Sequence, residues 1–236
     1  MKHMKKNKLG IILLALVCAG MTMVPYASAY QASSYGPEYS DMNTMQTAIN
    51  ADAELDNMGY VSTAYYHSGI FYPNPTAGDA RSRMSSDNVF FFDGHGGPGI
   101  IQFPDGSGII ALNTGAFPQY LQGSSGALSD IILAVYMACN TGVTSGAYGN
   151  LLGQSYAEGI DQSIGWTSNI DSGYSGYWSD RFWYWADEGC TPKIAAQRAT
   201  SDLYDISPYY YGGMNNYLCN GNNYCTMTID PARAGY

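Results

Sequence analysis

Residues 89–97 read VFFFDGHGG, four consecutive apolar residues followed by an aspartate and by a histidine set among glycines. Such an apolar run predicts a short strand with both faces buried, as in a sheet covered by helices on each side. Residues 131–138, IILAVYMA, predict a second buried strand, and Cys139 follows it directly. The chain therefore carries a histidine at the end of one central strand and a cysteine at the end of another.

The segments around these two strands alternate between strand and helix patterns. We predict further strands over 30–36, 60–67 and 164–168, and helices over 41–55, 77–84, 150–162, 177–188 and 191–204. The last helix has Thr191 as its N-cap and Pro192 at its first position. Turn residues 104–108 sit between two short apolar runs and predict a β-hairpin over 100–112. This order indicates a three-layer α/β/α sandwich with a mostly parallel sheet and a hairpin after the histidine-bearing strand.

The two strand ends carry the most informative chemistry. Ligands of open α/β sheets bind beyond the carboxyl ends of the strands, where His95 and Cys139 are expected. A neighbouring imidazole makes a cysteine nucleophilic at neutral pH, so the two residues are candidate catalytic partners. The backbone N–H groups of Gly96 and Cys139 are candidates for holding an oxyanion. Asp93, two residues before the histidine, is a candidate for orienting its ring.

A strand ending in His-Gly, followed about forty residues later by a strand ending in Ala-Cys, resembles the caspase-like cysteine peptidases. This group includes caspases, gingipains, clostripain, legumain and separase. The segment 151–188, with Gly165-Trp166 between two predicted helices, is similar to the stretch after the cysteine in bacterial and archaeal members. The similarity extends over residues 41–204. It implies a secreted cysteine endopeptidase that works with a His95/Cys139 dyad on a peptide or protein substrate.

The resemblance also bears on specificity. Caspases carry Gln-Ala-Cys with a glycine two residues after the cysteine, whereas this chain has Met137 before Ala138-Cys139, and Gly142 lies three residues after the cysteine. Cleavage after aspartate is therefore not expected. Trp166 is expected to line the substrate pocket, and Asp161 and Asp171 are candidates for selecting a basic side chain, as in related peptidases with Arg or Lys preference.

The first 29 residues have the three parts of a secretory signal peptide. Four lysines precede an apolar run that is too short to span a membrane, and Ala27-Ser28-Ala29 closes it. We expect cleavage after Ala29 and a secreted or cell-surface domain over 30–236, without membrane contact afterwards. The remaining chain would hold 6 Lys and Arg against 19 Asp and Glu, a net charge of −13. This acidity argues against nucleic-acid binding.

Four cysteines remain after the expected cleavage: Cys139, Cys190, Cys219 and Cys225. In an exported chain we expect a disulfide between Cys219 and Cys225, within a C-terminal hairpin or loop over 218–230, and a reduced Cys139. Cys190 would be free or would pair with Cys139.

Other functions fit the same residues less well. Gly94–Gly99 matches G-x-G-x-x-G, but hairpin residues follow it where a nucleotide-binding motif needs a helix. Only His67 and His95 remain after the signal segment, without the ligand spacing of a zinc site. We therefore expect no cofactor and no metal, and a monomer. The alternative to a peptidase is a non-catalytic cell-surface or binding protein on the same fold.

Overall fold

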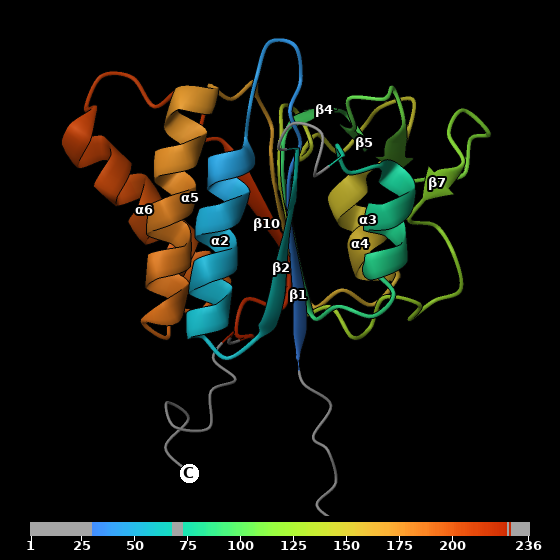
Figure 1. Cartoon of the computed structure of the whole chain (residues 1–236), viewed down its shortest axis with the longest axis horizontal. Coiled ribbons are helices and arrows are strands. Elements are labelled where there is room, and N and C mark those ends of the chain that lie inside the picture. Colours follow the sequence, from blue (N-terminus) through green and yellow to red (C-terminus); the bar gives the residue numbers. More distant parts are fainter. Residues whose placement is uncertain (1–29, 68–72, 226, 228–236) are drawn as a thin grey trace, which may run out of the picture.

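The computed structural model describes residues 30–67, 73–225 and 227, and Figure 1 shows a central sheet with helices on both faces. The proposed signal segment lies outside the described residues. The main sheet has six strands in the order β10-β9-β8-β3-β1-β2. These strands are β1 (Gln31–Gly36), β2 (Val61–Tyr66), β3 (Val89–Asp93), β8 (Leu133–Met137), β9 (Gln162–Trp166) and β10 (Tyr217–Gly221). All neighbours are parallel except β9 and β10.

The two strands predicted as fully buried lie next to each other near the middle of this sheet. Every residue of β3 and β8 is buried. The pairing of Val89 with Leu133 continues in register to the pairing of Asp93 with Met137. The predicted first strand is also confirmed, because β1 pairs with both β2 and β3 and is buried along most of its length.

Helices cover both faces of the sheet, which confirms the three-layer α/β/α prediction (Figure 1). One face carries α2 (Met45–Asn57), α5 (Ser172–Asp187) and α6 (Pro192–Ile206), and the other carries α3 (Ala77–Arg83) and α4 (Leu151–Ala157). Thr191 caps α6 with its hydroxyl, as predicted. Helix α5 begins five residues earlier than predicted, because the Asp171 side chain accepts a hydrogen bond from the Gly173 N–H.

The predicted hairpin belongs to a second, smaller sheet beside the carboxyl end of β3. Its order is β4-β5-β6-β7, with β4 (His95–Gly97), β5 (Ile100–Gln102), β6 (Gly108–Ile110) and β7 (Gln119–Tyr120). Strands β5 and β6 are antiparallel and form the hairpin. Because β4 contains His95, the chain leaves the main sheet at the histidine and enters the smaller one.

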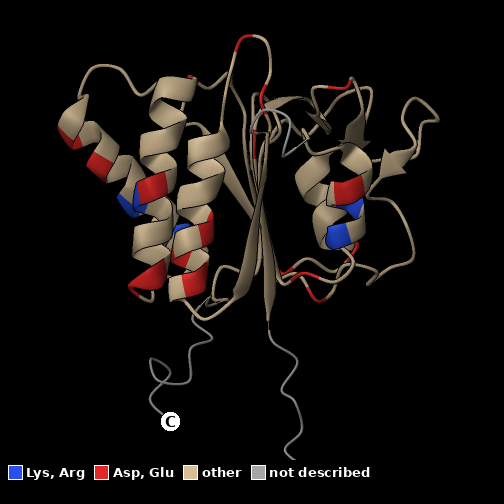
Figure 2. Ribbon diagram, viewed as in Figure 1, with Lys and Arg blue, Asp and Glu red and all other residues tan. Residues whose placement is uncertain are grey.

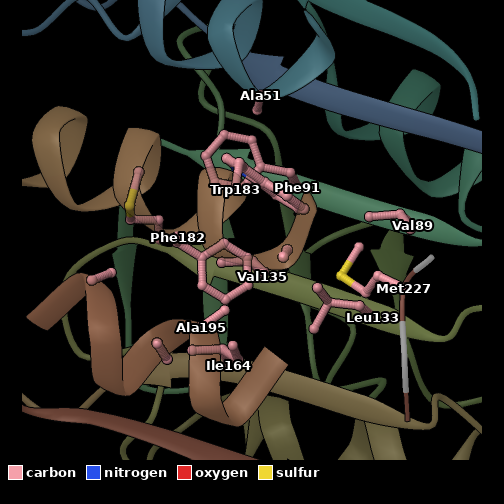
Figure 3. Close-up of a cluster of buried hydrophobic side chains, with 14 of the residues drawn as sticks. Ala51, Val89, Phe91, Leu133, Val135, Ile164, Phe182, Trp183, Ala195 and Met227 are labelled. Carbon is pink, nitrogen blue, oxygen red and sulfur yellow. The ribbon is translucent and has the colours of Figure 1, made fainter. Parts of the chain in front are cut away.

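Two apolar cores fill the spaces between the sheet and its helices. Figure 3 shows the larger core, where Phe91, Val135 and Ile164 come from three neighbouring strands. Trp183 of α5 meets the Phe91 ring edge to face, with ring centroids 5.5 Å apart. Such aromatic contacts stabilise a core beyond the area that they bury.

The charged residues lie mostly on helices and loops, as Figure 2 shows. Across the described ranges, no helix is both long and apolar enough to cross a membrane.

The cysteine pairing predicted for the C-terminal segment is wrong in this structure, where Cys219 and Cys225 are both free. Cys219 lies within β10, opposite Ile164, so the strand continues where a turn was expected. The Cys225 sulfur lies 3.5 Å from Oε1 of Gln162. Cys139 and Cys190 are also free.

Candidate active site

The strand register brings His95 and Cys139 together. Asp93 and Met137 are paired neighbours, and the Gly94 N–H donates to the Met137 carbonyl at 3.1 Å. Each candidate residue follows its strand by the same two positions. Both side chains line one pocket of about 310 Å³, so the structure joins the two residues that the sequence singled out.

The His95 ring is held by a residue that the sequence did not indicate. Its Nε2 atom lies 3.0 Å from Oδ1 of Asp41, in the loop between β1 and α2. The hydrogen bond with His95 holds the pKa of the Asp41 carboxyl below its usual range. The expectation that Asp93 orients the ring is therefore wrong. Asp41 precedes His95 by 54 residues and belongs to no motif, so no local signal could have found it.

Tyr39 anchors the same loop against the histidine. Its ring lies edge to face with the His95 ring, with centroids 4.4 Å apart. Its hydroxyl accepts a hydrogen bond from the His95 backbone N–H and donates one to the Gln102 carbonyl. Burial raises the pKa of Tyr39, so the hydroxyl keeps the proton that it donates. The position of His95 is thus fixed through both its ring and its backbone.

Cys139 stands at the start of a tight turn after β8. The next residue, Asn140, has a φ of 59°, and its N–H donates to the Ser168 carbonyl at 3.0 Å. Gly142 lies so close to the β9 backbone that an added Cβ would be 2.9 Å from the Gly165 carbonyl oxygen. The glycine three residues after the cysteine therefore has a packing reason of its own.

The sulfur of Cys139 faces the segment that leads into α5. It accepts a hydrogen bond from the Ile170 N–H at 3.4 Å and lies 3.8 Å from the Ile170 carbonyl oxygen. The turn and this donor together present the sulfur to the pocket in a defined position.

Two backbone positions beside the cysteine are the candidates for holding an oxyanion. No described residue accepts a hydrogen bond from the Cys139 N–H. At Gly96, an added Cβ would lie 2.7 Å from Cβ of Ala138, so only glycine allows this close approach to the cysteine-bearing segment.

The three residues expected in the substrate pocket have different positions. Asp171 lines the pocket that holds His95 and Cys139. Trp166 does not: it is the last residue of β9 and is fully buried, and its indole N–H donates to the Met214 carbonyl at 3.1 Å. Asp161 does not line it either: it directly precedes β9 and so lies at the amino ends of the parallel strands, away from His95 and Cys139.

A buried acid completes the pocket. Asp93 lines it and is only 2% exposed. Burial raises the pKa of its carboxyl to about 8, and a hydrogen bond from Thr47 opposes this shift. The full lining consists of Asp41, Met42, Asp93, Gly94, His95, Cys139, Ile170, Asp171, Ser172 and Ser175. Within the described ranges, no three or more His, Cys, Asp or Glu residues are grouped to hold a metal ion.

The mostly parallel sheet and its flanking helices form an α/β fold similar to the caspase-like fold of the gingipains. The chain is similar to the crystal structure of the Arg-specific cysteine proteinase gingipain R, with a TM-score of 0.60 and 12% sequence identity over 82% of this chain and 46% of that chain. It is also similar to the complex of Porphyromonas gingivalis RgpB pro- and mature domains, with a TM-score of 0.59 and 13% identity over 82% of this chain and 47% of that chain. A third similar structure, described as a protease, has a TM-score of 0.54 and 13% identity over 87% of this chain and 50% of that chain.

These similarities establish the fold, and the chain spans about half the length of the solved proteins that it matches. No protein-family model matches the sequence, and no curated protein matches it.

Proposed function

We propose that this protein is an exported cysteine endopeptidase in which Cys139 is the nucleophile and His95 the acid and base. The observation that carries the proposal is the shared pocket of the two side chains at adjacent ends of β3 and β8. The gingipain R structure, described as that of a cysteine proteinase, has the same fold and supports the assignment.

The reaction proceeds through an acyl-thioester. The Cys139 proton passes to His95, and the sulfur attacks the carbonyl carbon of the substrate peptide bond. As the tetrahedral intermediate collapses, the C–N bond breaks and His95 gives its proton to the departing amine. His95 then takes a proton from water, the resulting hydroxide attacks the thioester, and the C–S bond breaks to release the acid and restore the thiol.

Backbone donors would stabilise the charge on the substrate oxygen. We assign this role to the N–H groups of Cys139 and Gly96. The first has no acceptor among the described residues, and the second belongs to a segment that approaches Ala138 closely. Donors directed at a developing oxyanion are among the strongest contributions to this class of reaction.

Asp41 acts through His95 as a positioning residue. Its carboxylate holds Nε2, so the ring presents Nδ1 for the exchange of protons with Cys139.

Export is the second part of the proposal and depends on the sequence of residues 1–29. The mature protein would begin at Tyr30, act outside the cell on a peptide or protein substrate, and work as a monomer. Amino-terminal sequencing of protein recovered from the culture medium tests the start. A chain that retains Met1 would contradict it.

The dyad is tested by a thiol-directed peptidyl inhibitor, followed by mass spectrometry of the labelled peptides. We expect the label on Cys139 and hydrolysis of fluorogenic peptides by the parent protein. Cys139→Ala should show neither, whereas Cys190→Ala, the matched control outside the pocket, should keep both. Undiminished hydrolysis by Cys139→Ala would refute the proposal. A protein that neither hydrolyses nor labels would instead be a binding protein on this fold.

A further inference from the structure

The loop between β1 and α2, residues 37–44, carries the carboxylate that holds the His95 ring. Figure 1 shows this loop beyond the carboxyl ends of the strands. The Thr44 hydroxyl closes its base, 3.1 Å from the Pro37 carbonyl oxygen. The Asp41 side chain is 67% exposed, so its position depends on the path of the loop and not on packing around the carboxylate. Whatever fixes the loop therefore also fixes the partner of His95.

Asn74 joins this loop to the segment before α3. Its Oδ1 atom accepts a hydrogen bond from the Glu38 N–H at 2.9 Å, and its Nδ2 donates to the Glu38 carbonyl at 3.0 Å. One side-chain amide thus satisfies both polar groups of one backbone residue, as a neighbouring strand would do. The His67 ring adds a weaker contact from the same side, with Nε2 3.7 Å from Oε2 of Glu38.

The sequence around Asn74 makes its side chain a rigid partner. Asn74 lies between Pro73 and Pro75. Proline fixes its own φ and restricts the residue before it to extended conformations. Pro75 is buried, and the Thr76 hydroxyl caps α3 by accepting a hydrogen bond from the Asp79 N–H. The amide is therefore presented to the loop from a backbone that is fixed on both sides.

The two halves of the loop are held by different parts of the molecule. Glu38 forms an isolated antiparallel bridge with Asn43, which connects the halves. The second half is attached to β3, because the Thr44 hydroxyl lies 2.8 Å from the Asp93 carbonyl oxygen. The hydrogen bonds of Asn74 attach the first half to the segment before α3. Asp41 lies between these two attachments, so both define the position of its carboxylate.

Asn74 itself lies outside the candidate active site. It does not line the pocket of His95 and Cys139, but lines a separate pocket of about 430 Å³ between β2 and α3. Any effect of Asn74 on the reaction must therefore pass through Glu38 and the loop.

We propose that Asn74 is a positioning residue of the candidate active site: its amide fixes Glu38, and thereby the loop that holds Asp41 against Nε2 of His95. Without this amide, the exposed carboxylate would spend less time within hydrogen-bond distance of the ring. The ring would then adopt orientations that do not present Nδ1 to Cys139, and small errors of this kind slow a reaction strongly. This inference rests on the proposed peptidase function and extends it to a residue outside the pocket.

A matched pair of asparagines tests the assignment by kinetics. The amide of Asn88, before β3, also joins two backbone segments: it accepts from the Gln31 N–H and donates to the Asp130 carbonyl, both at 2.9 Å. Asn74→Ala should lower kcat on a fluorogenic peptide by about three- to tenfold and leave KM within about twofold, because Asn74 does not touch the substrate. Asn88→Ala, at the amino ends of the strands, should leave kcat within about twofold.

A double variant shows whether Asn74 acts through Asp41. If it does, Asn74→Ala combined with Asp41→Asn should have the same kcat as Asp41→Asn alone, because the carboxylate that the loop positions is already lost. If Asn74→Ala lowers kcat by the same factor with and without the Asp41 carboxylate, the two residues act independently and the positioning role is wrong.

A titration separates this inference from the peptidase function. The hydrogen bond with His95 lowers the pKa of the Asp41 carboxyl, which NMR of its carboxyl carbon measures without any substrate. In Asn74→Ala this pKa should rise towards its ordinary value, since a hydrogen bond that forms less often stabilises the carboxylate less. Asn88→Ala should leave it unchanged.

Thermal unfolding of each variant verifies that it is folded. Asn74→Asp is the second variant, since it keeps an acceptor for the Glu38 N–H and loses the donor to the Glu38 carbonyl. It should change kcat and the Asp41 pKa in the same direction as Asn74→Ala, by a smaller amount.

The results for Asn74 and for the peptidase can be told apart. An Asp41 pKa that stays the same in folded Asn74→Ala and Asn74→Asp would overturn the role of Asn74 and leave the peptidase proposal standing. An Asp41 pKa that depends on Asn74, in a protein that hydrolyses no peptide, would support the link between Asn74 and Asp41 and refute the peptidase.

Discussion

Cys139 lies beyond the carboxyl end of β8, whereas Cys225 lies near the amino ends of β8 and β9. Both side chains are partly buried. The sulfur of Cys139 receives a hydrogen bond from the Ile170 N–H and shares a pocket with His95. The sulfur of Cys225 faces two oxygen atoms, the Ile132 carbonyl at 3.9 Å and Oε1 of Gln162 at 3.5 Å. The Cys139 sulfur also has an oxygen neighbour, the Ile170 carbonyl at 3.8 Å, so the two sites differ in the N–H donor at Cys139 and in the second oxygen at Cys225.

The electrostatic surroundings of Cys225 also disfavour its thiolate. Burial, followed by the negative charge of Asp161, raises the pKa of the Cys225 thiol to about 11. The Cys139 sulfur instead lies at the carboxyl ends of the strands, in the pocket that the His95 ring also lines. Both cysteines are partly buried, but Cys225 has a thiol that resists ionisation and Cys139 is a candidate nucleophile. Neighbouring donors and charges decide the reactivity of a cysteine.

Removal of each sulfur is the strongest test of this comparison. Cys139→Ala should lower peptidase activity by at least about a thousandfold, because a nucleophile that works as a unit with its base carries almost the whole effect. Cys225→Ala should leave kcat/KM within about twofold. Steady-state rates on one fluorogenic peptide measure both. Equal losses in the two variants would indicate damage to the fold instead of to the chemistry.

Alkylation of the parent protein compares the two sulfurs directly. At pH 8, a thiol with a pKa of about 11 is ionised to roughly one part in a thousand. We expect iodoacetamide to modify Cys139 at least about a hundredfold faster than Cys225, as followed by peptide mass spectrometry. His95→Ala should slow only Cys139. If Cys139 keeps its rate in this variant, the two residues do not act as a pair.

The positioning role of Asp41 can be tested against Asp161, an acid at the opposite ends of the parallel strands. Asp41→Asn should lower kcat by roughly tenfold, a moderate loss because the carboxylate is exposed and its effect is screened by solvent. The acidic limb of the pH–rate profile should also change, because the Asp41 carboxyl, whose pKa the hydrogen bond with His95 lowers, no longer titrates in this variant. Asp41→Glu should recover part of the rate and the profile. Asp161→Asn, the matched change at the amino ends of the strands, should alter neither kcat nor the pH–rate profile. An equal change in the profile of this variant would point to a general charge effect.

Stability gives the smallest expected difference. The folded-state pKa of Asp93, about 8, is higher than that of the unfolded chain, so the folded protein binds more protons between about pH 4 and 8. The parent protein should therefore lose stability relative to Asp93→Asn as pH rises through this range, by up to about 1.4 kcal/mol per pH unit. Urea unfolding of both proteins at pH 6 and pH 7 measures the difference. A constant difference between the two proteins would show that Asp93 is ionised when the pocket is empty.

Residues close together in the sequence were enough to predict the layered fold and the candidate pair His95 and Cys139. Runs such as VFFF and IILAVYMA can be satisfied only in strands covered on both faces, and the cap at Thr191 acts within its own helix. His95 and Cys139 were recognisable because each follows such a run within three residues. Short-range patterns of this kind have the same meaning in any tertiary context.

The hydrogen-bond partners of the site residues and their burial depend on long-range contacts that the sequence does not reveal. Asp41 reaches His95 across 54 residues of sequence, through a loop whose path depends on β1, β3 and the Tyr39 contacts. The prediction for Trp166 failed because this residue lies two positions after Ile164, on the same face of β9, where its ring packs against Trp178 of α5 in the core. The burial that raises the pKa of Asp93 comes from packing beneath α2 and α5. Local periodicity specifies an element and its apolar face, but long-range contacts determine what each polar group at its end will meet.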